Sequence, residues 1–104
     1  MTGADGISLH VVHLTLRGRV QGVGYRAWCA REAGARGLLG WVRNRRSGAV
    51  EAVLAGSPDV VAAMVEACRV GPLGARVDDL LMHEAAETAL AASGRDAFVV
   101  LETL

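Results

Sequence analysis

The organisation of this chain follows from one stretch, Gly18-Arg19-Val20-Gln21-Gly22-Val23-Gly24-Tyr25-Arg26. An alternating apolar segment leads into this stretch, and a helical pattern begins where it ends. A glycine-rich turn exposes successive backbone N–H groups, because no Cβ blocks approach or forbids positive φ. The helix N-terminus that follows adds unpaired N–H groups and the positive end of the helix dipole. The stretch therefore predicts a cradle for a small anion such as phosphate.

Arg26 lies in the first turn of the expected helix. Its guanidinium offers a planar fork of donors that matches phosphate or carboxylate oxygens. The same residues also fit a plain glycine-rich strand–helix connection in which Arg26 is a solvated helix residue. The stretch is not a Walker loop, because no Gly-Lys-Ser/Thr follows, and it lacks the spacing and the later ribose-binding acid of a dinucleotide fingerprint.

The length of the chain indicates how many domains it forms, and its charge distribution indicates what kind of ligand the cradle binds. The chain has 104 residues, of which 52% are hydrophobic, so we expect residues 1–8 to be a flexible N-terminal tail and residues 9–104 to form one domain. Residues 1–50 hold eight arginines and two acids, residues 51–104 hold three arginines and nine acids, and there is no lysine. The cradle lies in the basic half, which favours an anionic ligand, although opposite charges can also simply occupy different faces.

The remaining composition argues against several other classes of protein. Residues 1–8 have no basic region followed by an apolar run, and no apolar stretch is long enough to span a bilayer, so neither a signal peptide nor a membrane partner is expected. Cys29 and Cys68 fall in predicted helices without metal-ligand spacing, which favours buried free thiols in a cytoplasmic protein, with a disulfide as the alternative. The three histidines also lack ligand spacing, so neither a metal nor a cofactor is expected.

Alternation and helical periodicity divide the chain into elements. Residues 9–17 alternate, with Val12, Leu14 and Leu16 on one side, which predicts a strand with one buried face. Residues 25–36 predict a helix that Gly37 ends in a left-handed conformation. The other expected elements are strands over 38–44, 49–55, 75–84 and 97–101, a helix from a Ser57 cap to Gly71-Pro72, and an ambiguous alanine-rich segment over 85–95.

The order of these elements predicts a fold. A β-α-β-β-α-β order with a final short strand is typical of a ferredoxin-like α/β sandwich of the α+β class, with a mostly antiparallel sheet and two helices on one face. We expect the other face of the sheet to be open to water. In the fourth strand, alternation places Val77, Asp79 and Leu81 on one side.

A second motif, Gly40-Trp41-Val42-Arg43-Asn44, ends the second strand. The short amide of Asn44 could hold a water molecule against a bound phosphoryl group, or Asn44 could simply start the turn over residues 44–48. Trp41 is expected on the open face of the sheet beside Arg43 and Arg45. There it could stack a nucleic-acid base or be a half-covered surface residue beside solvated charges.

The two motifs together resemble the acylphosphatase family. Residues 18–26 are similar to its signature Gly-x-Val-Gln-Gly-Val-x-Phe-Arg, residues 40–44 are similar to its second signature Gly-Trp-Val-x-Asn, and the distance between them fits. The resemblance covers nearly the whole chain. It implies hydrolysis of a small acyl phosphate to a carboxylate and inorganic phosphate, without a metal. It also implies that Arg26 binds the phosphoryl group, that Asn44 orients the attacking water, and that the backbone of the cradle is supplied by Gln21, Gly22, Val23, Gly24 and Tyr25.

Two positions depart from the family pattern. Tyr25 stands where Phe is usual, which adds a hydroxyl that needs a partner. Leu101 stands where the last strand often carries Arg, and we expect this change to affect packing or stability more than chemistry.

Two alternatives to catalysis stay open. One is a non-catalytic phosphate-binding module, since acylphosphatase-like domains also occur within larger carbamoyl-transfer enzymes. The other is RNA binding on the open sheet face, which needs exposed aromatic residues on two central strands. The chain has only four aromatic residues, so a nucleic-acid partner is not expected. The expected partner is a small-molecule acyl phosphate, bound by a monomer because the predicted fold leaves no large apolar stripe uncovered.

Overall fold

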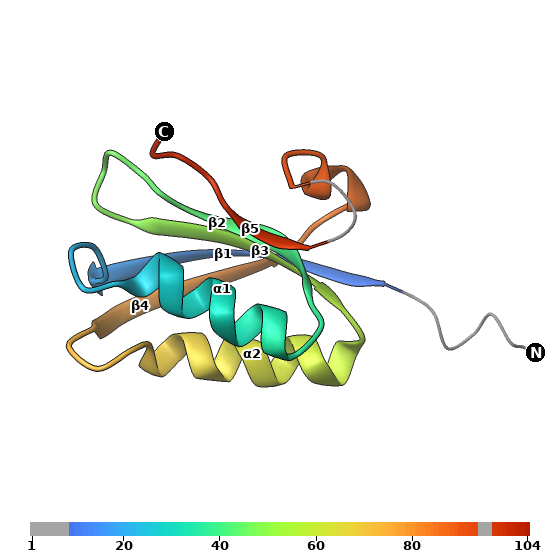
Figure 1. Ribbon diagram of the computed structural model, residues 1–104, viewed down its shortest axis with the longest axis horizontal. Coiled ribbons are helices and arrows are strands. Elements are labelled where there is room, and N and C mark those ends of the chain that lie inside the picture. The colour runs from blue at the N-terminus through green and yellow to red at the C-terminus, as the bar shows by residue number, and fades with distance from the viewer. Residues whose placement is uncertain (1–8, 94–96) are drawn as a thin grey trace, which may run out of the picture.

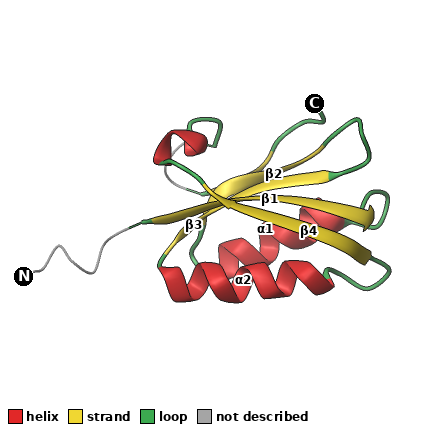
Figure 2. Cartoon of the chain, turned by 180° about the vertical axis from the view of Figure 1, so that it is seen from behind, coloured by secondary structure: helices red, strands yellow, loops and turns green. Residues whose placement is uncertain are grey.

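Two helices pack on one face of a five-stranded sheet in the computed structural model, which describes residues 9–93 and 97–104 (Figure 1, Figure 2). The elements are β1 (His10–Arg19), α1 (Tyr25–Ala35), β2 (Leu39–Asn44), β3 (Val50–Gly56), α2 (Pro58–Val70), β4 (Arg76–Glu84), the 3₁₀ turn η2 (Glu87–Leu90) and β5 (Phe98–Val100). This order confirms the ferredoxin-like α+β fold. The expected tail over residues 1–8 lies outside the described residues.

The strands are arranged in the order β4-β1-β3-β2-β5. β1 pairs antiparallel with both β3 and β4, β2 pairs antiparallel with β3, and β5 runs parallel to β2 at the edge. The sheet is therefore mostly antiparallel, as predicted. Because β3 lies between β1 and β2, the strand that leads into the glycine-rich stretch is not a neighbour of the strand that ends at Asn44.

The main core lies between the sheet and the helices. Alternation in β1 places Val12, Leu14 and Leu16 on the helix side, where all three are buried. Both helices meet them with the residues that periodicity predicts: α1 with Tyr25, Cys29 and Ala33, and α2 with Val61, Met64, Val65 and Cys68. Each fully buried large apolar side chain contributes about 1.5–3 kcal/mol relative to an exposed one. This layer fixes both ends of the glycine-rich stretch.

The far face of the sheet is not open to water throughout, so that expectation is wrong at one end. Val11, Trp41, Val53 and Ala55 are buried there in a second cluster under the alanine-rich segment, whose η2 turn covers the face opposite the helices (Figure 1). Trp41 is only 8% exposed, and its Nε1 donates to the Ala89 carbonyl at 2.8 Å. Trp41 is thus neither a stacking platform nor a half-covered surface residue.

A bulge in β4 changes which of its side chains share a face. Arg17 pairs with Asp79 but Gly18 pairs with Val77, so Asp78 is the extra residue. Val77 consequently packs with Leu80 against the helix-side core, and the expected grouping of Val77 with Asp79 and Leu81 is wrong. Gly18 is required opposite the bulge, because a Cβ on it would clash with the Arg76 carbonyl oxygen.

The start of α2 corrects one further prediction. Ser57 is the N-cap residue of α2 and has extended backbone angles, but its side chain makes no capping hydrogen bond. Pro58 in the first turn and Asp59 near the positive end of the dipole are placed as expected. Gly37, with φ of 72°, follows α1 as predicted.

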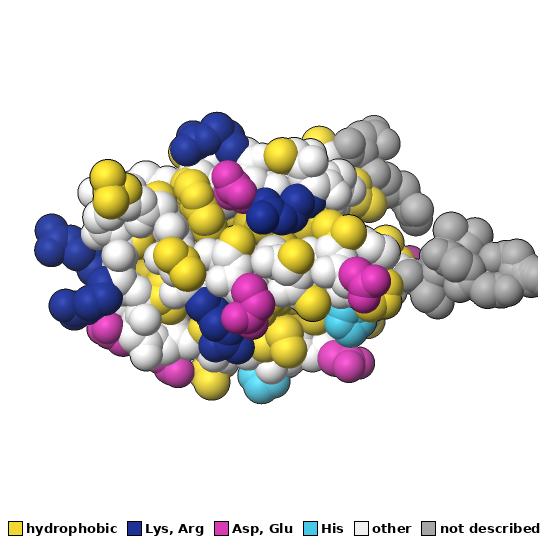
Figure 3. Space-filling view, turned by 90° about the horizontal axis from the view of Figure 1, so that it is seen from below, with side chains coloured by type: hydrophobic (Ala, Val, Ile, Leu, Met, Phe, Trp, Pro, Cys, Tyr) yellow, Lys and Arg dark blue, Asp and Glu magenta, His cyan; other side chains and the backbone are white. Residues whose placement is uncertain are grey.

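Folding mixes the charges that the sequence separates. The strand order interleaves the basic and acidic halves of the chain, so that Glu51 on β3 lies 2.7 Å from His13 Nε2 and 3.3 Å from Arg45 Nη1. On the face seen from below, acidic and basic side chains are spread among apolar ones (Figure 3). Charge separation along the sequence therefore does not give a face of one sign in this view.

Candidate active site

The glycine-rich stretch forms an open turn between β1 and α1. Gly22 and Gly24 have φ values of 75° and 79°, which side-chain-bearing residues rarely adopt. A Cβ on either glycine would meet no atom within 4 Å, so open space lies beside the backbone. Gly24 is the N-cap of α1, and no side chain caps the helix. The first N–H groups of α1 therefore lack intrahelical partners and are left for a ligand.

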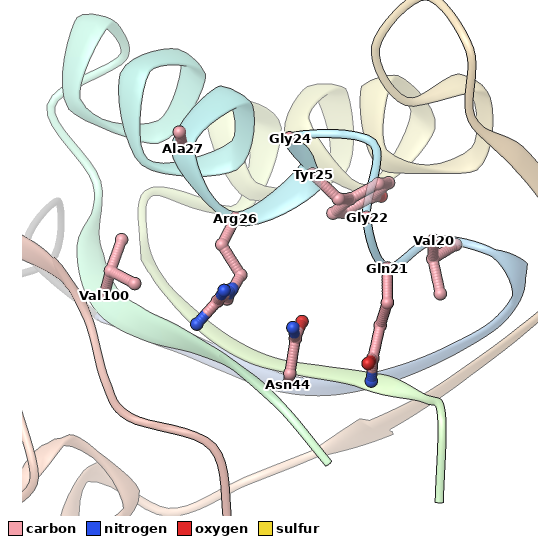
Figure 4. Close-up of a pocket in the computed structure, with 9 residues that line it drawn as sticks. All are labelled: Val20, Gln21, Gly22, Gly24, Tyr25, Arg26, Ala27, Asn44 and Val100. Carbon is pink, nitrogen blue, oxygen red and sulfur yellow. The ribbon is translucent and has the colours of Figure 1, made fainter. Parts of the chain in front are cut away.

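A cavity of about 320 Å³ lies between this turn and the end of β2 (Figure 4). Arg26 extends from the first turn of α1 into the space above β2, with Asn44 on one side and Val100 of β5 on the other (Figure 4). The lining residues are Val20, Gln21, Gly22, Gly24, Tyr25, Arg26, Ala27, Asn44 and Val100. The cavity thus combines residues from both sequence motifs with one residue from the last strand.

Arg26 is the charged residue of this cavity. Its side chain is half-buried, and within the ranges 9–93 and 97–104 it makes no hydrogen bond or ion pair with another residue. The guanidinium donors of Arg26 and the first N–H groups of α1 therefore line the same cavity. An anion bound there would meet a full positive charge together with the positive end of a helix dipole.

Asn44 faces the cavity from the last position of β2. Its Oδ1 is buried and has no hydrogen-bond partner in the described part of the chain. A buried unsatisfied acceptor costs about 1–3 kcal/mol, which a bound water molecule offsets. The backbone of Asn44 is held at the same time, since its carbonyl accepts from the Leu104 N–H at 3.1 Å. Asn44 therefore has a fixed backbone and a side-chain acceptor with no partner among the described residues.

Gln21 lines the cavity, and its side chain extends away from α1 (Figure 4), so that its amide group reaches the connection between β2 and β3. Its Nε2 donates to the Arg45 carbonyl at 2.8 Å and to the Ala49 carbonyl at 2.9 Å. Both amide hydrogens are thus used within the protein. What Gln21 can offer a phosphoryl group is its backbone, as the family resemblance implies.

Tyr25 also lines the cavity with its backbone, because its side chain is buried in the core. The ring is 1% exposed and packs edge-on against Trp28, with ring centroids 5.2 Å apart. Its hydroxyl donates to the Cys68 carbonyl at 2.6 Å. That carbonyl lacks its usual helical donor, because residue 72 is a proline without an N–H. Burial raises the pKa of the Tyr25 phenol well above its usual value, so the group stays neutral.

The other predicted or candidate groups lie away from the cavity lining. Val23 packs against the helix-side core instead. Cys29 and Cys68 are buried free thiols; the pKa of Cys29 is raised by its hydrogen bond with Cys68 and by burial. Across the two described ranges, His, Cys, Asp and Glu side chains form no group of three that could hold a metal ion.

Three lining residues were not predicted from the sequence: Val20, Ala27 and Val100. Val20 lies within the first motif and Ala27 directly follows it, so the extent of the motif along the chain could have suggested both. Val100 enters because β5 pairs parallel to β2. Nothing in the sequence of a three-residue strand indicates which edge it joins, so no signal for Val100 was available.

Fold and site together define a ferredoxin-like α/β sandwich with a cavity, lined by Arg26 and Asn44, where the first strand turns into the first helix. The sequence model of the family described as Acylphosphatase matches residues 12–94. The chain belongs to the acylphosphatase family.

Individual relatives support this assignment. An acylphosphatase from Azorhizobium caulinodans is 65% identical over 69 residues, covering 66% of this chain and 74% of that protein. An acylphosphatase from Rhodopseudomonas palustris is 56% identical over 84 residues, covering 81% of this chain and 85% of its own length. The solved structure of an acylphosphatase from Coxiella burnetii superposes with a TM-score of 0.80 at 30% identity, covering 89% of this chain and 93% of the other. In the described residues, no helix has the length and apolar character needed to cross a membrane.

Proposed function

We propose that this protein is an acylphosphatase that hydrolyses the carboxyl–phosphate bond of a small acyl phosphate, giving a carboxylate and inorganic phosphate. The observation that carries the proposal is the composition of one cavity. Arg26, the N-terminal backbone of α1 and Asn44 all line it, although β1 and β2 are not adjacent strands. Membership of the acylphosphatase family supports the same reaction.

The phosphoryl group would lie in the turn over residues 21–25, with its oxygens on the free N–H groups. Two of those oxygens would also face the guanidinium fork of Arg26, which matches them in a bidentate arrangement. Charge accumulates on these oxygens as the P–O bond breaks, so donors that are already oriented stabilise the transition state. Arg26 and the backbone of Gln21, Gly22, Val23, Gly24 and Tyr25 are therefore assigned to phosphate binding.

Asn44 would hold the attacking water. Its Oδ1 needs a donor, and a water molecule placed between Oδ1 and the phosphorus atom would satisfy that acceptor while being oriented for in-line attack. A carboxylate is a good leaving group, so the reaction does not need a strong general acid. Positioning and charge stabilisation can then supply the catalysis, without a nucleophilic side chain among the lining residues.

Phosphate release from an acyl phosphate such as benzoyl phosphate tests this proposal. The wild type should be active with a chelator present, since the family resemblance implies a metal-free reaction. Arg26→Ala should lose about a hundred- to a thousandfold in kcat and bind inorganic phosphate more weakly. Asn44→Ala should lose a similar factor in kcat with phosphate affinity nearly intact. A folded wild type that binds phosphate but releases none would favour the alternative, a non-catalytic phosphate-binding module.

We also propose that the partner is a small-molecule acyl phosphate and that the location is cytoplasmic. A small acyl phosphate suits a cavity of about 320 Å³. The alternative of RNA binding depended on an exposed Trp41. It is disfavoured because Trp41 is buried and hydrogen-bonded to Ala89. The free thiols of Cys29 and Cys68 support a cytoplasmic location. A monomeric state stays a prediction, which sedimentation analysis would test.

A further inference from the structure

The two halves of the candidate site are carried by strands that do not touch. The phosphate cradle follows β1, and Asn44 ends β2, with β3 lying between the two strands. The pairing of β1 with β3 stops at Leu16 opposite Val50, before the cradle begins. Strand pairing therefore fixes Asn44 relative to Leu16, through Val50 between them, but it does not extend to the cradle itself.

The Gln21 side chain joins these halves. Its Nε2 donates to Arg45 and Ala49, which face each other across the β2–β3 connection, where the Arg45 N–H also donates to the Ala49 carbonyl at 2.8 Å. Arg45 directly follows Asn44 in the sequence. Among the hydrogen bonds described for residues 9–93 and 97–104, these two are the ones that connect residues 20–27 to this connection.

We propose that Gln21 is a positioning residue that sets where Asn44 stands relative to the bound phosphoryl group. This inference rests on the proposed function, because it assigns Gln21 a role in orienting the attacking water through Asn44. Both amide hydrogens of Gln21 go to backbone carbonyls, so its side chain acts on the hairpin and not on the phosphate.

The cradle has its own anchors, which makes the role of Gln21 separable from phosphate binding. Val20 is 1% exposed at one end of the cradle, and at the other end Tyr25 is buried and bonded to the Cys68 carbonyl. The outer edge of Asn44 is held by Leu104. Asn44 also stays paired with Val50 on β3, so loss of the Gln21 amide would loosen the connection that directly follows Asn44 and leave the cradle in place.

Kinetics of Gln21→Ala test this separation. A displacement of about 1 Å in a group that orients a reactant can cost about a hundredfold, and with the Leu104 contact retained we expect a fall in kcat of about ten- to a hundredfold. The dissociation constant for inorganic phosphate should change less than about threefold, because Arg26 and the cradle N–H groups remain. In an Asn44→Ala background, Gln21→Ala should lower kcat less than about twofold, since two residues acting as one unit are not additive.

Gln21→Glu provides a second variant with nearly the same shape. Its carboxylate has no hydrogen to donate and places negative charge against two carbonyl oxygens, so kcat near neutral pH should fall at least as far as in Gln21→Ala. Protonation restores one O–H donor. The deficit relative to the wild type should therefore shrink as the pH is lowered to about 5, towards the range in which a carboxyl group with unfavourable neighbours becomes protonated. A merely structural role would not produce this pH-dependent recovery.

Ser47→Ala is the matched control, because Ser47 Oγ accepts from the Ala49 N–H at 3.3 Å within the same connection, whereas the described residues show no hydrogen bond between Ser47 and the cradle. Its kcat should stay within about twofold of the wild type. NMR of the Asn44 side-chain amide gives a readout that is independent of turnover: its resonances should shift or broaden in Gln21→Ala and stay unchanged in Ser47→Ala.

The outcomes separate the positioning role from the proposed function. A wild type without activity would refute the function, while the NMR comparison would still decide whether Gln21 positions Asn44. Unchanged Asn44 resonances in a folded Gln21→Ala protein would overturn the inference. Weakened phosphate binding with unchanged kcat, or a kcat deficit that persists in full in the Asn44→Ala background, would overturn it as well.

Discussion

Replacing Tyr25 with phenylalanine removes one hydroxyl from the core and leaves one buried carbonyl without a donor. The Cys68 carbonyl accepts from Tyr25 at 2.6 Å, residue 72 is a proline, and the Gly71 N–H is already used by Ala67. A buried group left unsatisfied costs about 1–3 kcal/mol. For a chain of this size 1 kcal/mol corresponds to about 4–8 °C in Tm, so Tyr25→Phe should lower Tm by about 5–20 °C.

Thermal unfolding followed by circular dichroism measures this change, and urea unfolding gives the free energy directly. Ser47→Ala, which removes an exposed hydroxyl with a 3.3 Å hydrogen bond, is the control and should change stability by less than about 0.5 kcal/mol. Hydrolysis at 25 °C should be retained, because Tyr25 offers the cavity only its backbone. If Tyr25→Phe unfolds within about 2 °C of the wild type, the carbonyl has another donor and the reasoning fails.

The same hydroxyl predicts a pH dependence with a definite sign. Burial raises the pKa of Tyr25 in the folded state above its ordinary value of 10.0, so the folded protein keeps a proton that the unfolded chain releases. The stabilisation is complete below about pH 10 and is lost above it, at about 1.4 kcal/mol per pH unit. Between pH 10 and 11 the wild type should therefore lose stability more steeply than Tyr25→Phe, and parallel curves would contradict the assignment.

Three further substitutions have calculable outcomes. Trp41→Phe loses the hydrogen bond to Ala89 and should lower the free energy of unfolding by about 1 kcal/mol, measured by urea titration, with little effect on kcat. Gly24→Ala forces a side chain into a φ of 79°, which costs about 1–2 kcal/mol and should also raise the dissociation constant for phosphate, measured by calorimetry. Arg26→Lys keeps the charge but loses the fork, so kcat/KM for an acyl phosphate should fall at least about tenfold, and full activity would show that charge alone suffices.

The element order and most residues of the cavity could be predicted because they depend on short-range patterns. Alternation in β1 and four-residue spacing in α1 report directly which side chains are buried. Gly22, Gly24, Arg26 and Asn44 were found because two motifs at a fixed separation restrict the geometry strongly. The roles assigned to Arg26 and Asn44 remain proposals that the kinetic experiments address.

The parts that could not be predicted depend on long-range contacts or on a single irregular residue. One extra residue at Asp78 shifts the alternation of β4, and nothing in the local sequence marks it. Trp41 is buried because the alanine-rich segment folds across the sheet from 48 residues away. Gln21 was assigned to the cradle through its backbone, whereas the partners of its side chain belong to a connection more than 20 residues later.

β4 runs along an outer edge of the sheet, where unpaired backbone groups can recruit a strand from another molecule and start aggregation. The bulge at Asp78 interrupts the regular spacing that such pairing requires. Asp78 and Asp79 are both exposed there, and a second copy of the strand would bring their negative charges together. The bulge that interrupts the alternation of β4 therefore also hinders this edge from pairing with another strand, which favours solubility at high protein concentration.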